Sequence, residues 1–392
     1  MTERKKIAAV VTEYRIPAHA DVIVGKFIKG FPMDEGLIAP KVDIASLYLD
    51  QIPENDIGLQ VAEEYGIPIY NSIVKALCLG GDELAVDGVI SIGEHGDYAA
   101  NEKDQRMWPR RYFFEQIAGV IATSNRAVPV FSDKHLSYNW QDAKWMYDRA
   151  SKLGIPFMAG SSIPLIWRDP WLEHELETPI DEAIILGRGS LEGYGFHSLE
   201  ALQEMVERRR GAETGIAAVQ YLEGDAVWKA GDQGLWSREL AKAAVEAGDT
   251  LKDVEGDMES NCPEPVAFLL EYNDGFKAVV LRLTNYVREW IYAARVDGQV
   301  QVTSLNSCGP PYPIFSYLGL NIQEMFLTGV PQYPVERTLL VTGALEALME
   351  SRYQGSVRVK TPHLNVRYKA PNKRPIRPTA PRPVGASKVP FD

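Results

Sequence analysis

The chain has 392 residues, of which 45% are hydrophobic and 24% are charged, and its formal net charge is −12. This composition is that of a globular protein, and the length is sufficient for two domains with separate cores. The negative charge argues against a nucleic-acid or acidic-membrane surface, and no apolar run is long enough to span a bilayer. Three widely spaced cysteines without metal-ligand spacing favour a reduced, cytoplasmic protein.

The first 160 residues alternate between strand and helix patterns. Apolar runs predict strands at 7–11, 43–49, 67–70, 87–92, 128–132 and 155–159. Amphipathic spacing predicts helices at 20–29, 55–65, 72–79, 109–121 and 141–153. This alternating order predicts a parallel sheet with helices on both faces. The stretch FPMDEGLIAP, residues 31–40, is expected to be an inserted loop.

From residue 161 the pattern changes to longer strands joined by hairpin signals. Asn273-Asp274-Gly275 separates strands expected at 266–272 and 276–283, and Asp297-Gly298 separates strands expected at 290–296 and 299–305. The expected helices are 197–209, 315–327 and 335–351. We therefore expect a first domain at 1–160 and a second, α+β domain at 161–368.

The tail, residues 369–392, contains six prolines and six basic residues against one acidic residue. Such a composition cannot build a hydrophobic core. Two interpretations are open. The tail is either disordered or an extended arm that holds another subunit of this acidic protein.

The first strand runs into VVTEYRIPAHAD, where a dinucleotide-binding domain has the glycines of G-x-G-x-x-G. Those glycines form the tight turn and let the backbone approach a pyrophosphate. Thr12 and Tyr14 take two of the glycine positions, and bulky side chains there are expected to push a pyrophosphate off the helix N-terminus. NAD(P) binding in the usual pose is therefore doubtful, and a rearranged pose is open. Asp50 would hold a ribose hydroxyl only if a nucleotide is retained.

Two stretches resemble the Gfo/Idh/MocA oxidoreductase family. PVERTLLVTGALEALMESRYQGSVRVKTP, residues 334–362, is similar to the end of those proteins, and EEYGIPIYNSIVKAL followed by VDGVISI is similar to their nucleotide domain. The resemblance covers about residues 5–368 by element order and suggests a divergent member without the glycine-rich fingerprint. It implies a Rossmann-like, doubly wound parallel sheet followed by an α+β domain on an open antiparallel sheet.

Members of this family usually transfer hydride between NAD(P) and sugars or polyols, and the resemblance implies two site residues. The segment VPVFSDKHLSY places Lys134 where the family has the lysine of an E-K-P motif. The segment GYGFHSLEALQ places His197 at the family's catalytic histidine, but the aspartate found four residues earlier is Gly193 here, with Glu192 beside it. The free face of the family's open sheet usually forms a subunit interface, which implies a homo-oligomer through this sheet and the tail.

Acidic and imidazole groups follow three strands whose carboxyl ends meet at one edge of the sheet, where ligands bind in such folds. The loop GEHGDY follows the fourth strand, Asp133-Lys134-His135 follows the fifth, and Glu13, Arg15 and His19 follow the first. Carboxylates and imidazoles suit Mn²⁺, Zn²⁺ or Fe²⁺. The expected metal ligands are Glu94, His95, Asp133 and His135. The alternative is that these residues only make turns and helix caps.

Other residues are assigned to catalysis and substrate binding. The expected catalytic groups are Lys134, His197 and Asp97. The expected substrate contacts are Glu13, Arg15, Tyr98, Trp167, Arg168 and Tyr194. Arg110, in a first helical turn, forms either a surface salt bridge or a contact with a carboxylate of the GEHGDY loop.

The leading hypothesis is an enzyme that uses a divalent metal to catalyse a non-redox reaction, hydrolysis or elimination, on a sugar-like or other polyhydroxylated small molecule. The first alternative is an NAD(P)-dependent sugar or polyol oxidoreductase with an aberrant phosphate-binding turn, using Lys134 and His197. The second alternative is a non-catalytic ligand-binding relative. Neither nucleic acid nor membrane is expected as a partner.

Overall fold

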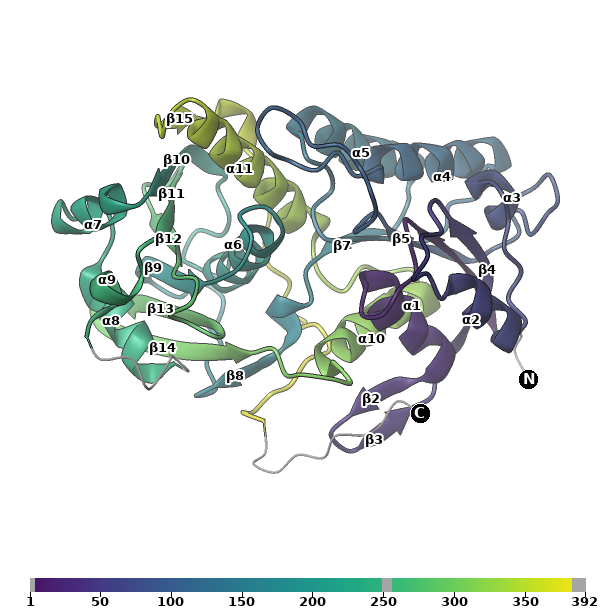
Figure 1. The fold of residues 1–392 in the computed structure, drawn as a ribbon, viewed down its shortest axis with the longest axis horizontal. Coiled ribbons are helices and arrows are strands. Elements are labelled where there is room, and N and C mark those ends of the chain that lie inside the picture. Colours follow the sequence, from purple (N-terminus) through teal and green to yellow (C-terminus); the bar gives the residue numbers. More distant parts are fainter. Residues whose placement is uncertain (1–3, 249–255, 383–392) are drawn as a thin grey trace.

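A five-stranded parallel sheet forms the first half of the molecule (Figure 1). The computed structural model describes residues 4–248 and 256–382. The strand order is β4-β1-β5-β6-β7, so the chain winds outward from β1 in both directions. The strands are β1 (Lys5–Val11), β4 (Val42–Leu49), β5 (Gly88–Ile92), β6 (Val130–Asp133) and β7 (Phe157–Gly160).

Helices cover both faces of this sheet, because the side chains of β1 alternate between two cores. Ile7, Ala9 and Val11 pack on one side, while Ala8 and Val10 pack on the other. The first side holds α1 (His19–Lys29), α2 (Gly58–Tyr65) and α10 (Pro313–Thr328). The second side holds α3 (Ile73–Leu77), α4 (Arg110–Ser124) and α5 (Trp140–Leu153). The expected loop at 31–40 instead contains a small hairpin of β2 (Phe31–Met33) and β3 (Gly36–Ile38).

An eight-stranded sheet forms the second half, in the order β15-β10-β11-β12-β9-β13-β14-β8. All neighbouring pairs are antiparallel except β12 and β9. The predicted fold class, a doubly wound parallel sheet followed by a domain on a mostly antiparallel sheet, is therefore confirmed. The strands are β8 (Trp167–Asp169), β9 (Ile180–Gly187), β10 (Ile216–Glu223), β11 (Val266–Tyr272), β12 (Lys277–Arg282), β13 (Trp290–Val296), β14 (Gln299–Asn306) and β15 (Val359–Lys360).

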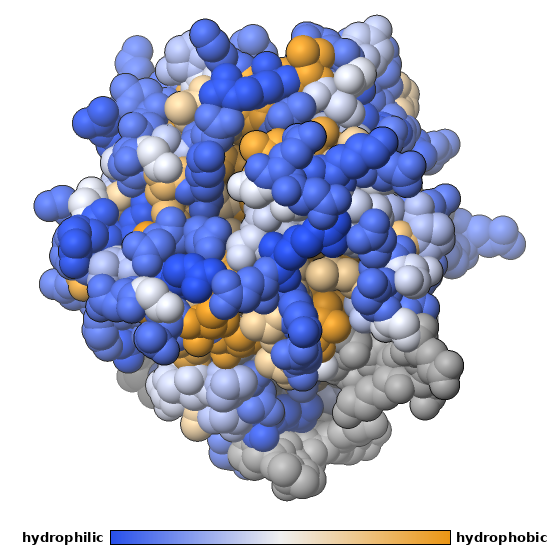
Figure 2. All heavy atoms as spheres, turned by 90° about the vertical axis from the view of Figure 1, so that its left-hand side faces the viewer, coloured by the Kyte–Doolittle hydropathy of each residue, from blue (hydrophilic) through white to orange (hydrophobic). Residues whose placement is uncertain are grey.

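Helices also lie on both faces of the second sheet. The inner face packs against α6 (Gly193–Val206) and α11 (Val335–Tyr353). Three helices that the sequence patterns did not predict pack on the outer face, namely α7 (Asp225–Asp232), α8 (Arg238–Ala247) and α9 (Met258–Asn261). Seen from this side, the surface is mostly hydrophilic with separate apolar areas (Figure 2). The chain thus covers much of the face expected to join subunits, and the homo-oligomer stays a prediction.

Part of the tail lies along its own chain as a segment that we call the strap, residues 369–382. Arg377 is buried and its Nη1 donates to Glu204 Oε1 at 2.6 Å in the second domain. The backbone N–H of Ile376 donates to Asn321 Oδ1 of α10 at 2.9 Å, and Arg382 Nη2 donates to Asp34 Oδ1 at 2.7 Å, beside the β2–β3 hairpin. The strap therefore bridges the two halves of its own chain and is ordered rather than disordered, while an arm that holds another subunit stays a prediction. Residues 383–392 lie outside the described part, and the boundaries 160/161 and 368/369 stay predictions.

The remaining expectations about membranes and disulfides can be compared with the structure directly. Within residues 4–248 and 256–382, no helix has the length and apolar composition needed to cross a membrane. Cys78, Cys262 and Cys308 are all free thiols.

Candidate functional site

A cleft of about 680 Å³ lies between the two domains, a volume typical of small-molecule sites. The start of α1 contributes His19, the loops after β5 and β6 contribute His95 and Lys134, and the second turn of α6 contributes His197. Trp290 of β13 also lines it. The carboxyl edge of the parallel sheet thus faces the second domain, where ligands bind in doubly wound folds.

Two residues at this edge have left-handed backbone conformations that are uncommon outside glycine. His95 has φ 71° and Lys134 has φ 60°, each just after its strand. The Lys134 N–H donates to Gly160 O at 3.1 Å, which ties this turn to the end of β7. Burial lowers the pKa of His95 to about 4, and its Nδ1 has no hydrogen-bond partner among the described residues. Such conformations persist only where surrounding contacts hold them.

Glu94 forms ion pairs with two cationic side chains at this site. It is buried, its Oε1 accepts from Lys134 Nζ at 2.7 Å, and its Oε2 accepts from the Arg110 guanidinium. Burial alone would raise the pKa of Glu94, but the charges of Lys134 and Arg110 hold it well below its usual range. The Arg110 side chain therefore reaches a carboxylate of the GEHGDY loop, one of the two interpretations of its position.

The other acids and imidazoles at this edge are also engaged. His19 Nδ1 lies 2.6 Å from Asp133 Oδ2. Arg110 Nη1 donates to His135 Nε2 at 3.0 Å, and burial together with the Arg110 charge lowers the pKa of His135. Within the described residues, no three His, Cys, Asp or Glu side chains are arranged to hold a metal ion.

The prediction of a metal site formed by Glu94, His95, Asp133 and His135 is wrong. The residue types suit a metal, but the Glu94 carboxylate is already neutralised by cations of the protein. It pairs with the ammonium of Lys134 and the guanidinium of Arg110. A metal ligand must offer a free lone pair, and His135 Nε2 uses its own to accept from Arg110.

His197 enters the cleft from the opposite domain and is held from behind. Its Nδ1 lies 2.6 Å from Ser161 Oγ, which also accepts from the Ile163 N–H at 3.0 Å. Burial, and then the positive charge of Lys134, place the pKa of His197 well below its usual value. The imidazole is therefore neutral at physiological pH, and Nε2 is the nitrogen left for a ligand.

The carboxylate beside Lys134 belongs to the β5 edge of the first sheet and not to α6. A Cβ built on Gly193 would lie 3.8 Å from Lys134 Nζ, so an aspartate at this helix position would reach the ammonium. Glycine cannot do so, and Glu94, at the end of β5, makes the contact instead. The sequence pattern assigned Glu94 to a metal because it could not show this pairing.

The turn after β1 does not block a nucleotide in the way expected. Tyr14 is 1% exposed and belongs to the core between α1 and α2. Its hydroxyl would lie 3.3 Å from a Cβ on Gly25, and its Cβ 3.1 Å from one on Gly58, so these two glycines make room for the ring. The bulky side chain therefore points into the protein rather than outward from the turn.

Two further features fit a dinucleotide. Ala18 provides no side-chain cap to α1, which leaves the first N–H groups of this helix available to a phosphate. Asp50 follows β4, where its Oδ1 accepts from the Tyr48 hydroxyl at 2.7 Å and its Oδ2 from the Tyr98 hydroxyl at 2.6 Å. A carboxylate has further lone pairs, so Asp50 can still accept from a ribose hydroxyl.

The structure brings only some of the other expected residues to the cleft. Tyr194 lines it, with its ring stacked on Trp290 at 5.8 Å between centroids. Glu13 and Arg15 pair with each other at 2.5 Å. The other four do not line the cleft. Asp97 is exposed, the Tyr98 hydroxyl donates to Asp50, and Trp167 and Arg168 are buried in β8.

Neither a protein-family model nor a curated protein matches the chain. Solved structures do match. GenD2 from gentamicin A biosynthesis, in complex with NAD, has a TM-score of 0.57 at 15% identity, covering 92% of this chain and 97% of its own. Scyllo-inositol dehydrogenase from Lactobacillus casei, with NAD(H) and scyllo-inositol, has a TM-score of 0.55 at 10% identity, covering 91% and 99%. Aldose-aldose oxidoreductase from Caulobacter crescentus, with glycerol, has a TM-score of 0.52 at 15% identity, covering 91% and 100%.

These similarities correct two predictions. Similar structures contain NAD or NAD(H), and none of those described here points to metal-assisted hydrolysis or elimination, so that leading hypothesis is wrong. The preference for a transition metal over NAD(P) is wrong as well. The parallel sheet precedes the mostly antiparallel sheet along the chain, as expected, and the match to GenD2 covers 92% of this chain. The chain therefore has the fold of the Gfo/Idh/MocA oxidoreductases, as the sequence resemblance indicated.

Proposed function

We propose that the protein is an NAD(P)-dependent oxidoreductase that interconverts a hydroxyl and a carbonyl group on a sugar-like or polyol substrate. The observation that carries this proposal is the position of Lys134 and His197, which line one cleft from two domains beside the uncapped start of α1. Two solved structures of the same fold support it, GenD2 in complex with NAD and scyllo-inositol dehydrogenase with NAD(H) and scyllo-inositol.

The proposed roles follow from the contacts of each side chain. Bound NAD(P) supplies the hydride acceptor or donor. Lys134, held by Glu94, orients the substrate oxygen and stabilises negative charge that develops on it as its proton leaves. Neutral His197 accepts that proton at Nε2 while Ser161 fixes the ring through Nδ1. In the reverse direction the same imidazole returns the proton to the carbonyl oxygen.

Asp50 favours NAD over NADP in this proposal. An acidic residue at the end of the second strand suits a ribose with a free 2′-hydroxyl, whereas a 2′-phosphate would meet a carboxylate there. The hydroxyls of Tyr48 and Tyr98 hold both carboxylate oxygens in place, which fixes the orientation of Asp50 before a nucleotide arrives.

Calorimetric titration with NAD⁺ and NADP⁺ tests the cofactor. We expect NAD⁺ to bind more tightly, and Asp50→Ala to weaken NAD⁺ by about tenfold to a hundredfold, because hydrogen bonds to charged groups contribute about 1.5–3 kcal/mol. The exposed Asp82→Ala is the matched control and should leave NAD⁺ affinity unchanged. NADH formation with glucose, galactose, myo-inositol and glycerol then tests the reaction. Failure of the wild-type protein to bind either nucleotide would contradict the proposal.

A further inference from the structure

A second cleft of about 390 Å³ adjoins the first at Lys134. His95, Lys134 and Tyr194 line both clefts, so the proposed catalytic ammonium stands between them. Trp108, Glu192 and Arg352 also line the second cleft. Its volume lies within the range of small-molecule sites, about 300–1,000 Å³.

The absence of a side chain at Gly193 keeps the inner end of this cleft open. Gly193 lines the cleft, and a Cβ there would lie 3.1 Å from Ser190 Oγ and 3.8 Å from Lys134 Nζ. A carboxylate extending from that Cβ would occupy the space beside the ammonium. With Glu94 as the partner of Lys134, this space is available to a ligand.

The wall of the second cleft carries an unsatisfied buried carboxylate. Glu192 is 8% exposed, and its Oε2 accepts from the Arg106 N–H at 3.0 Å. Its Oε1 has no hydrogen-bond partner among the described residues, and His135 Nε2, at 3.7 Å, already accepts from Arg110 and has no proton to give. A buried carboxylate oxygen without a donor is costly, which points to a ligand that brings one.

The other groups around the cleft suit a neutral, polyhydroxylated ligand. Trp108 presents an aromatic ring whose Nε1 also has no partner within the described part of the chain. The lining has no excess charge, because three carboxylates are matched by three cations: Glu94, Asp104 and Glu192 against Lys134, Arg106 and Arg352. An aromatic ring beside balanced polar groups recognises the apolar faces and hydroxyls of a sugar.

We propose that the second cleft binds a second sugar ring, so that the substrate is a neutral disaccharide or glycoside rather than a free monosaccharide. This inference rests on the proposed function, because it extends the same substrate past Lys134. The reacting ring lies in the first cleft, and a hydroxyl of the second ring donates to Glu192.

Equilibrium binding tests this inference separately from turnover. Calorimetry would compare cellobiose, lactose and maltose with glucose and galactose, using the full chain in the presence of NAD⁺. We expect at least one disaccharide to bind about tenfold or more tightly than its component monosaccharides, the advantage of one or two added hydrogen bonds. Equal affinities, or no binding by any of the three disaccharides, overturn the inference. Absence of NADH formation despite such a preference would instead contradict the proposed reaction.

Two variants locate the preference. Gly193→Asp fills the inner end of the second cleft and should abolish the disaccharide advantage. Glu192→Gln keeps an oxygen for the Arg106 N–H but replaces the other acceptor with an NH₂ group, and should reduce the advantage with less effect on folding. Glu63→Gln, exposed on α2, is the matched control. An undiminished preference in both cleft variants would place the second ring elsewhere and overturn the inference.

Discussion

Glu94 and Glu204 are buried carboxylates that are each held by two cations. Glu94, beside the first cleft, is held by Lys134 and Arg110. Glu204, inside the second domain on α6, is held by Arg168 of β8 and Arg377 of the strap. Burial would raise the pKa of both acids, and the neighbouring cations hold both pKa values well below the usual range.

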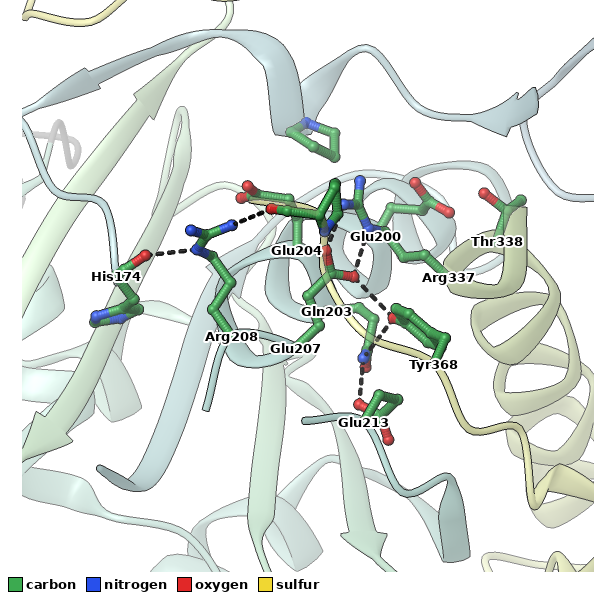
Figure 3. Close-up of polar contacts among 12 residues, drawn as sticks. His174, Glu200, Gln203, Glu204, Glu207, Arg208, Glu213, Arg337, Thr338 and Tyr368 are labelled. Atoms are coloured by element: carbon green, nitrogen blue, oxygen red, sulfur yellow. Dashed lines mark hydrogen bonds and ion pairs between the residues drawn. The ribbon is translucent and has the colours of Figure 1, made fainter. Parts of the chain in front are cut away.

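The difference between them lies in what the cations face. Lys134 lines two clefts, whereas Arg168 and Arg377 are buried and line neither. Three residues further along the chain, Glu207 is also buried and accepts hydrogen bonds from Arg337 and Tyr368 (Figure 3). A strongly shifted pKa therefore marks a buried ion cluster, and only access to a cleft makes such a cluster a candidate site.

The largest expected effect is on catalysis at the first cluster. Lys134→Met should lower kcat by about 10²–10⁴-fold, because a positioned ionic group that assists proton transfer is lost. The Lys134 charge is also one cause of the low pKa of His197, so the acidic limb of the residual kcat/KM should move to higher pH. The pH dependence of NADH formation measures both. An acidic limb that stays in place would show that His197 is not the group that titrates.

At the second cluster the expected effect is on folding. Glu204→Ala leaves Arg168 and Arg377 buried without their shared carboxylate and should lower the free energy of unfolding by about 3–5 kcal/mol. Urea denaturation measures the loss. Glu246→Ala, which removes one partner of the exposed Lys242 pair, should cost about 0–1 kcal/mol. If both variants lost the same stability, burial would not distinguish the two ion pairs.

A third carboxylate, Glu200, provides a smaller and pH-dependent effect. Burial raises its pKa to about 7 despite the charge of Arg337. The folded state therefore holds a proton that the unfolded state releases near pH 4.3, and stability falls as pH rises from about 4.3 to about 7. Glu200→Gln mimics the protonated acid. At pH 8 the free energy of unfolding of this variant, measured by urea denaturation, should exceed that of the wild type by about 1–3 kcal/mol, and at pH 4 the two values should differ little. A gain that is equal at both pH values would contradict the raised pKa.

The sequence predicted what depends on local patterns. Apolar runs predicted the five strands of the first sheet, but also a strand at 67–70 that forms only an isolated bridge at Ile69. The resemblance pointed to Lys134 and His197, which line one cleft. The sequence could not predict pairings that depend on distant segments, such as Lys134 with Glu94, 40 residues apart. The direction of the Tyr14 ring depends on space left by Gly25 and Gly58, which no local pattern reveals. The metal prediction failed for the same reason, since residue types suggested ligands whose partners are cations.

The strap also determines when the second domain can be completed during synthesis. Arg377 follows Glu204 by 173 residues, and Arg382 follows Asp34 by 348. Until the strap has been synthesised, Glu204 has Arg168 but not Arg377 as a cation partner, although α6 and β8 both precede the strap in the chain. Synthesis of the strap therefore supplies the second cation of this buried cluster and a link between the two halves, so a polypeptide that stops short of the strap lacks both.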